Sequence, residues 1–217
     1  MIDLNDLALD LTLWLPGNVI ATILYLISIL EFPGPVVSRP KGRSMSIKDE
    51  QVTSNEYDFT AADDWFSHNI DIWKSLTHHV QSASPRALEI GSWEGRSAVF
   101  LLTNLCKAAG EVVCIDHFDM LDTPGGCARF DRINRNLTLA GGKFRVLDEF
   151  SVPGLMMLLE EEMLSETPGF DWIYIDGSHE ASDTLLDGEL VWRLARKGSI
   201  VIFDDYVCPV ISKPSRS

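Results

Sequence analysis

The sequence predicts an α/β domain built on a doubly wound, mostly parallel sheet. Three observations support this fold class: five short apolar segments alternate with helical patterns, the first segment leads directly into a glycine turn, and several of the segments end in an acidic residue. Strands that alternate with helices form parallel sheets with right-handed crossovers. We expect the strand order 3-2-1-4-5.

Length and composition fit one domain with a sizeable core. The chain has 217 residues, and its apolar fraction of 46% is that of a globular protein. The net charge of −14 argues against a nucleic-acid partner, because phosphate binding depends on Lys and Arg. The four cysteines form no C-x-x-C pair, so we expect reduced thiols in the core.

The N-terminal part differs from the rest, and we divide the chain into an apolar segment with linker, residues 1–45, and a domain, residues 46–217. Residues 11–30 carry no charge and have the length of a membrane span, although Pro16 and Gly17 interrupt them. Acidic residues precede the run, which is unlike a secretory signal. Two interpretations stay open: a helix that packs on the domain or on an oligomer partner, and a membrane contact through residues 11–30. We expect a cytoplasmic protein, with membrane association as the alternative.

An N-terminal helical extension is predicted to lead into the first strand. Residues 31–53 are a linker by composition, rich in Pro and Gly. Thr60 is placed as an N-cap, with Asp63 three positions later in a capping-box arrangement. Apolar residues then recur every three to five positions between Trp65 and Val80, which predicts an amphipathic helix.

The first strand and its turn organise the rest of the domain. Residues 87–90 are apolar except for Glu89, and a buried carboxylate is costly unless it is paired. Gly91 permits a sharp turn, and Gly95 permits the next helix to begin close to a ligand. Trp93 stands where a dinucleotide fold has its middle glycine, which weakens the case for NAD or FAD. A ligand with positive charge and no phosphate, such as S-adenosylmethionine, suits this turn better.

The remaining elements alternate in the same way. The helix after the turn ends at Gly110, and Gly198 is expected to end the last helix after the basic residues Arg196 and Lys197. Further strands are predicted at 111–115, 144–147, 170–175 and 199–203, and further helices around 130–140, 155–164 and 185–194.

Four of the predicted strands end in acidic residues. They are Glu89, Asp116, Asp176 and the pair Asp204 and Asp205. Because the carboxyl ends of parallel strands meet at one edge of a sheet, we expect these side chains to surround one crevice. Asp116 is placed either to hold a pair of ribose hydroxyls or to cap the next turn. Asp176, Asp204 and Asp205 could supply oxygen ligands to Mg²⁺.

Four motifs in order carry a family resemblance. LEIGSWEGRS at 88–97, CID at 114–116, IYIDGSH at 173–179 and IFDDY at 202–206 together resemble a class I S-adenosylmethionine-dependent methyltransferase. More narrowly they resemble methyltransferase family 24, with its macrocin-type and novobiocin-type sugar O-methyltransferases. The resemblance implies a Rossmann-like fold. Only eleven residues follow Tyr206, so we expect a C-terminally shortened sheet that lacks the family's final helix and β-hairpin.

The resemblance also implies roles for individual residues. Those that would bind the cofactor are Glu89, Gly91, Ser92, Trp93 and Gly95 at its methionine end, Asp116 at the ribose, and Asp148 and Ser151 near the adenine. Aspartates after the fourth and fifth strands bind Mg²⁺ in metal-dependent relatives, which corresponds to Asp176, Asp204 and Asp205. His179 is the candidate general base beside Asp176, and these two are the predicted catalytic residues.

The function that follows is S-adenosylmethionine-dependent O-methylation of a small hydroxylated molecule, with assistance from Mg²⁺. One alternative is an NAD(P)-binding oxidoreductase, against which Trp93 counts. Another is a catalytically impaired, membrane-tethered remnant of the fold. The edge of the fifth strand could also pair with a second copy, which makes a homo-oligomer an expectation.

Overall fold

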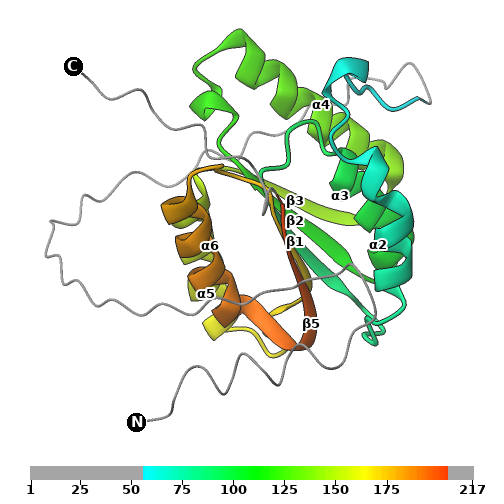
Figure 1. Cartoon of the computed structure of the whole chain (residues 1–217), viewed down its shortest axis with the longest axis vertical. Helices are drawn as coiled ribbons and strands as arrows, with labels where there is room; N and C mark the ends of the chain where they lie inside the picture. The colour runs from blue at the N-terminus through cyan, green and yellow to red at the C-terminus, as the bar shows by residue number, and fades with distance from the viewer. Residues whose placement is uncertain (1–55, 205–217) are drawn as a thin grey trace, which may run out of the picture. The chain divides into compact units, whose positions relative to one another are not determined.

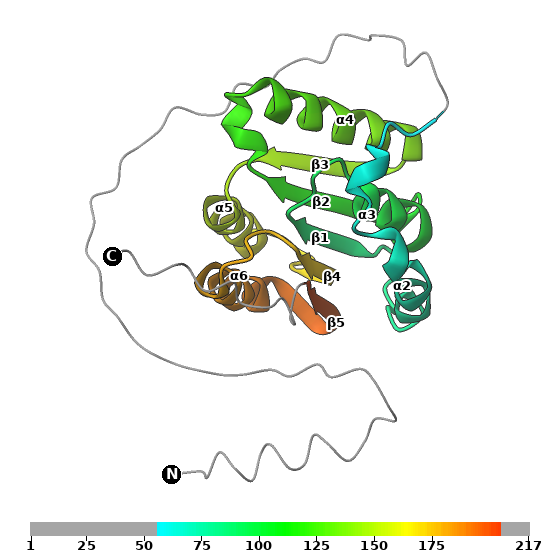
Figure 2. The same cartoon turned by 45° about the horizontal axis from the view of Figure 1, so that its top comes forward.

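The computed structural model describes residues 56–204, all of which lie in the second of two units, Asp49–Ser217. Five parallel strands form one sheet in the order β3-β2-β1-β4-β5, as Figure 2 shows, which confirms the predicted topology. The strands are β1 (Arg86–Ile90), β2 (Glu111–Asp116), β3 (Lys143–Asp148), β4 (Phe170–Ile175) and β5 (Ala195–Phe203).

Helices precede the sheet and connect its strands. Before β1 lie two short 3₁₀ turns and one helix: η1 (Ala61–Asp63), η2 (Ser67–Asn69) and α2 (Ile70–Thr77). The connections contain α3 (Arg96–Phe100), which continues as the π-helical η3 (Leu101–Cys106), then η4 (Phe118–Leu121), α4 (Pro124–Ala140), α5 (Ser151–Met163) and α6 (Ala181–Leu194).

The helices cover both faces of the sheet. In Figures 1 and 2, α2, α3 and α4 lie on one face and α5 and α6 on the other. Successive strand residues therefore enter different cores: Ala87 packs with the first group of helices, and Leu88 and Ile90 pack with the second. The central strands are buried on both faces, which explains their nearly continuous apolar sequences.

Backbone hydrogen bonds continue past the strands at the carboxyl edge. The Gly91 N–H donates to the Ile115 carbonyl at 2.8 Å, and the Asp176 N–H donates to the Ile90 carbonyl at 2.8 Å. The Asp204 N–H donates in the same way to Ile175 at 2.9 Å. These bonds hold the residues that follow the strands in line along one edge.

The predicted helix over 65–80 is broken. The regular helix α2 begins only at Ile70. Thr60 occupies the N-cap position of the short η1, but its side chain makes no capping bond there. The Thr60 hydroxyl bonds to Glu94 instead. Trp73, which is 2% exposed, anchors α2 in the core. Tertiary contacts have therefore overridden the local capping pattern.

The last helix also ends earlier than predicted. It stops at Leu194, and Arg196 and Gly198 lie within β5, where Gly198 has φ +86°. Arg196 is therefore not a basic residue in the last turn of α6, contrary to the prediction from the sequence. Its guanidinium bonds to the Asp171 carboxylate at 2.8 Å and to the carbonyls of Thr167 and Pro168.

Several predictions fall outside the described residues. They concern residues 11–30, Asp205 and the chain after it. Between residues 56 and 204, no helix has the length and apolar character needed to cross a bilayer. Among the described thiols, Cys106 and Cys114 are buried and Cys127 is exposed, and none forms a disulfide.

Candidate active site

The glycine turn between β1 and α3 is the geometric centre of the site. At Gly91, where φ is +81°, an added Cβ would lie 1.9 Å from the backbone oxygen of Asp176. At Gly95, where φ is +80°, an added Cβ would lie 2.7 Å from Cγ1 of Ile133. Both positions therefore require glycine. The close neighbour of Gly95 is helix α4, so packing alone requires a glycine there, and its contact with a ligand stays a prediction.

Asp116 closes the turn from the end of β2. Its Oδ2 accepts from the backbone N–H groups of Ser92 at 3.1 Å and Trp93 at 2.8 Å, and its Oδ1 accepts from Phe118 N–H at 2.9 Å. A carboxylate offers about four acceptor positions, so about one is left for a ligand hydroxyl. The half-buried Asp116 therefore caps the turn and keeps room for about one ligand hydroxyl, and its contact with the ribose stays a prediction.

Glu89 is enclosed behind the turn. Its side chain is fully buried, and it accepts hydrogen bonds from the hydroxyl of Ser97 and, at 3.7 Å, from the thiol of Cys114. Burial, aided by the negative charge of Asp176, raises the pKa of Glu89 to about 8, although the Ser97 hydrogen bond opposes the shift. A positive charge bound nearby would favour the ionised form.

Asp176 and Asp204 lie next to each other at the ends of β4 and β5. The Tyr174 hydroxyl donates to Oδ2 of Asp176 at 3.0 Å. Burial, followed by the charges of Asp176 and Asp204, raises the pKa of Tyr174, so both carboxylates lie close to this phenol. The structure thus brings Glu89, Asp176 and Asp204 into one electrostatic neighbourhood.

The described residues do not by themselves make a metal site. Between residues 56 and 204, no three side chains of the Asp, Glu, His or Cys type gather as a metal would require. Asp205, the third predicted ligand, lies outside that range. His179, the predicted base, is exposed in the loop that follows β4.

The predicted adenine side of the site is open. Asp148 is exposed and pairs in register with Asp116, and Ser151 begins α5. Between them, the Phe150 ring stacks on the His117 ring with centroids 5.1 Å apart and an interplanar angle of 18°. This aromatic pair lies at the ends of β2 and β3, beside Asp116.

A cavity lies between the turn and the chain that precedes α2. Its lining includes Phe59, Asp63, Trp65 and Phe66 from the N-terminal side and Gly91, Ser92, Trp93, Glu94, Arg96, Ser97 and Asp176 from the domain. The Trp65 and Trp93 rings meet edge to face at 5.5 Å. Nε1 of Trp93 is buried and has no acceptor among the described residues.

The sequence gives no role to three residues that link the turn to the chain preceding α2: Glu94, Arg132 and Asn136. Glu94 is read from the sequence only as one of the residues that form the turn. Asn136 is fully buried on the face of α4 that also carries Ile133 and Leu137. A polar residue on an apolar helix face was a signal that could have identified it.

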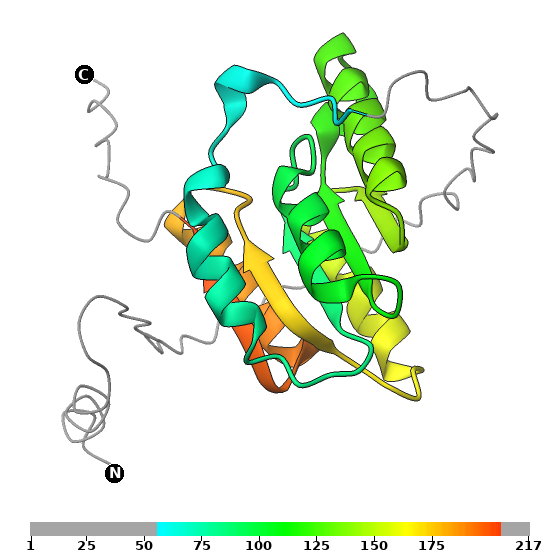
Figure 3. The ribbon, with the colours of Figure 1, turned by 90° about the vertical axis from the view of Figure 1, so that its right-hand side faces the viewer.

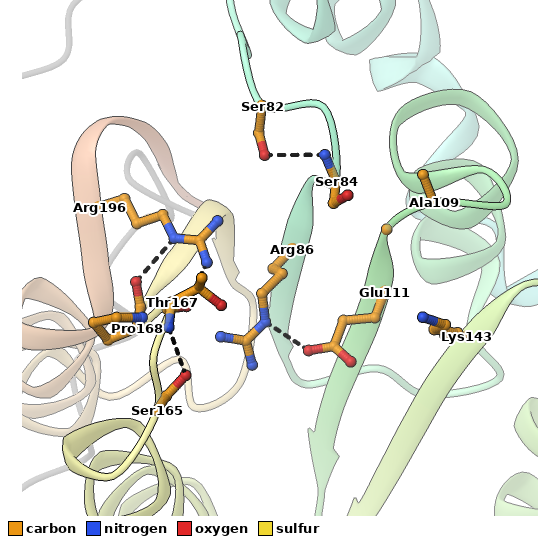
Figure 4. A pocket seen from close by; sticks show the side chains of 11 residues that line it. Ser82, Ser84, Arg86, Ala109, Glu111, Lys143, Ser165, Thr167, Pro168 and Arg196 are labelled. Carbon is orange, nitrogen blue, oxygen red and sulfur yellow. Dashed lines mark hydrogen bonds and ion pairs between the residues drawn. The ribbon is translucent and has the colours of Figure 1, made fainter.

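A second, larger cavity lies at the opposite, amino edge of the sheet (Figure 4). It has a volume of about 560 Å³ and is lined by Arg86, Glu111, Lys143 and Arg196, among others. Arg86 bonds to Glu111 at 2.6 Å and to Glu162 at 2.8 Å, and Arg196 bonds to Asp171. Its two arginines are therefore already neutralised, so the cavity lacks the charge and position of the predicted site.

Comparison with known proteins identifies a family. A family model described as a methyltransferase domain, number 24 in its series, matches residues 88–206. No curated protein matches the chain at a significant level. The match favours methyl transfer over the NAD(P)-dependent alternative.

Solved structures with a similar fold include three methyltransferases. An O-methyltransferase from Bacillus cereus in complex with SAH is 19% identical, with 66% of this chain and 58% of that chain covered and a TM-score of 0.48. A SAM-dependent methyltransferase from Agrobacterium tumefaciens is 13% identical (64% and 44% covered, TM-score 0.47). CalS11, a TDP-rhamnose 3′-O-methyltransferase of calicheamicin biosynthesis, is 17% identical (65% and 64%, TM-score 0.48). This chain spans less than two thirds of the length of each.

Proposed function

Because this chain belongs to methyltransferase family 24, we propose that it transfers a methyl group from S-adenosylmethionine to a hydroxyl group of a small molecule. The observation that carries the proposal is the glycine turn at the carboxyl edge of the sheet, closed by the Asp116 carboxylate through the N–H groups of Ser92 and Trp93. In α/β sheets of this order, nucleotide-like ligands bind at the turn after β1.

We assign residues of the chain to each part of the cofactor. Its methionine end would lie at the Gly91–Gly95 turn with Glu89 behind it, its ribose at Asp116, and its adenine beside Asp148 and Ser151. The cofactor supplies a methyl group on a positively charged sulfur. The buried Glu89 favours such a cation, because a nearby positive charge stabilises the carboxylate that burial destabilises.

Transfer to a hydroxyl requires that its proton be removed and its oxygen be aligned with the methyl group. His179 is our candidate for the base, and Asp176, which lies against Gly91, is our candidate for orienting the acceptor. Asp176, Asp204 and Asp205 remain the proposed Mg²⁺ ligands, and no step above depends on a metal.

The cofactor proposal is tested by calorimetry on the full chain with S-adenosylmethionine and S-adenosylhomocysteine, with and without Mg²⁺. We expect dissociation constants between about 1 μM and 1 mM, the usual range for enzyme ligands. Asp116→Asn should weaken binding about tenfold, because it removes a charged hydrogen-bond acceptor. The same change at the exposed Asp122 is the matched control. Absence of heat with both ligands would favour the inactive remnant.

The role of His179 is tested by following labelled methyl transfer to a panel of phenols and sugars. His179→Ala should lower kcat about 100-fold, the usual contribution of a general base, while S-adenosylhomocysteine affinity stays unchanged. His78→Ala, at an exposed histidine after α2, serves as control. Unchanged turnover in His179→Ala would eliminate the assignment.

A further inference from the structure

We propose that residues 57–66, here called the strap, close the methyl-donor pocket, and that Glu94, Arg132 and Asn136 are positioning residues that fasten it. The inference rests on the proposed function, because it takes the cavity beside the glycine turn as part of the donor site. Figure 3 shows this part of the chain crossing from α4 to α2 at the edge to which the strands point.

The Glu94 carboxylate is the main fastening point. It is 4% exposed and accepts from the Thr60 N–H at 2.6 Å, the Thr60 hydroxyl at 2.7 Å and Nη1 of Arg132 at 2.6 Å. Burial acts to raise the pKa of Glu94, but the bonds from Thr60 and Arg132 outweigh it and hold that pKa below its ordinary value. Because Glu94 belongs to the glycine turn, these bonds join the strap directly to the cofactor-binding backbone.

Asn136 makes a second connection from α4. Its Nδ2 donates to the backbone carbonyls of Asp58 and Glu94, both at 3.0 Å, and its Oδ1 accepts from the Asp58 N–H at 2.7 Å. One fully buried amide therefore bonds to both the N–H and the carbonyl of Asp58 in the strap, and to the Glu94 carbonyl in the turn. Losing either partner would leave buried polar groups unsatisfied.

Arg96 fastens the strap from the start of α3. Its guanidinium lies 4.4 Å from the centroid of the Phe59 ring, and Nη2 donates to the Thr60 carbonyl at 3.4 Å. Its Nε lies 3.5 Å from the Asp64 carboxylate. The strap is thus held along its length by side chains from the turn, α3 and α4.

The fastened strap leaves little room beneath it. The cavity lined by Phe59, Trp65 and Phe66 on one side and by the turn on the other has a volume of about 40 Å³. That is space for roughly one water molecule, whereas ligand pockets measure about 300–1,000 Å³. A donor can reach the turn only if the strap or its aromatic side chains move, and the refastened strap would then exclude water from the methyl group.

The test compares two isosteric changes in the full chain, Glu94→Gln in the strap network and Glu161→Gln in the exposed Arg145–Glu161 pair, whose Nη1–Oε2 distance is 2.6 Å. The hydrogen-exchange rates of the Thr60 and Asp58 amides measure how firmly the strap is held. Calorimetry measures the dissociation constant of S-adenosylhomocysteine. We expect Glu94→Gln to accelerate exchange of both amides at least about tenfold and to raise the dissociation constant about tenfold. Exchange at Ile90 and Ile175 in the core should not change, and Glu161→Gln should change none of these values.

Thr60→Val provides a milder variant should Glu94→Gln fail to fold. It keeps the side-chain shape and removes the hydroxyl bonds to Glu94 and from Arg132, while the bond from the Thr60 N–H to Glu94 stays. Both effects should therefore be about threefold. If the wild-type chain binds no S-adenosylhomocysteine, the proposed function is wrong. If the wild type binds and the variants exchange faster but bind equally well, the strap has a structural role only and this inference is overturned. Unchanged exchange in both variants also overturns it.

Discussion

The two edges of the sheet hold their carboxylates in different ways. At the amino edge, two half-buried carboxylates face arginines: Arg86 bonds to Glu162, and Arg196 bonds to Asp171. At the carboxyl edge, the acids of β1 and β2 accept from neutral donors: Glu89 is held by the Ser97 hydroxyl and Asp116 by backbone N–H groups, whereas Glu94 in the turn pairs with Arg132. A cation bound beside the turn would therefore act more strongly on Glu89 and Asp116 than on the arginine-paired carboxylates.

Cavity size alone would favour the amino edge over the edge that carries the proposed site. The amino edge has the larger cavity, about 560 Å³ against about 40 Å³. Yet the features that cost stability gather at the carboxyl edge, including the buried Glu89 and the left-handed backbone of Trp93 at φ 49°. Such costs are typical of functional sites, whereas paired charges in a satisfied network serve the fold.

The largest effect should come from filling the space at the carboxyl edge. Gly91→Ala would force a Cβ against the Asp176 carbonyl at a left-handed backbone position, and we expect a loss of about 4 kcal/mol or more in the free energy of unfolding. Gly141→Ala is the matched control, because φ is +73° there and no atom lies within 4 Å of the added Cβ. That control should lose only about 1 kcal/mol, from backbone strain. Equal losses in urea titrations would show that Gly91 is not sterically enclosed.

A smaller effect is expected from breaking the network at the amino edge. Arg86→Gln leaves Glu162 and Glu111 without their cation, and the free energy of unfolding should fall by about 3 kcal/mol. Arg145→Gln breaks an exposed Arg–Glu pair and should cost less than about 1 kcal/mol. S-adenosylhomocysteine affinity should stay within about twofold in both variants, since neither residue lies near the turn. A tenfold loss of affinity in Arg86→Gln would contradict the view that the amino edge serves stability and the carboxyl edge serves binding.

The smallest effect, measured per pH unit, should appear as a dependence of stability on pH that Glu89 causes. Its pKa is about 8 in the folded chain and 4.5 ordinarily, so between these values the unfolded chain has released a proton that the folded chain keeps. Wild-type stability should therefore fall as pH rises through this window, by on the order of 1 kcal/mol per pH unit. Glu89→Gln has no such proton, so its stability relative to wild type should rise between pH 5 and pH 8. For Glu160→Gln, a change at an exposed residue, the difference in stability from wild type should not vary with pH. If the difference for Glu89→Gln did not vary with pH either, the pKa of Glu89 would lie near its ordinary value.

The sheet and the turn were predictable because local sequence determines them. Apolar segments bounded by glycine and acidic residues located all five strands, and parallel topology then placed the acids at one edge. What failed was local reasoning about Thr60, whose partner Glu94 is 34 residues away. The predicted end of α6 was wrong for the same reason, because Arg196 bonds to Asp171 across the β4–β5 pair. Contacts between distant residues leave no spacing pattern that one sequence can reveal.

The burial of Asn136 has a consequence for covalent modification. Asn136, Leu137 and Thr138 match the acceptor sequence for N-linked glycans, which are attached to the asparagine amide nitrogen. That nitrogen is the donor to Asp58 and Glu94, and its side chain has no surface exposed to solvent. A sugar at this position would remove those bonds and could not be accommodated, so the folded domain and a glycan at Asn136 exclude each other.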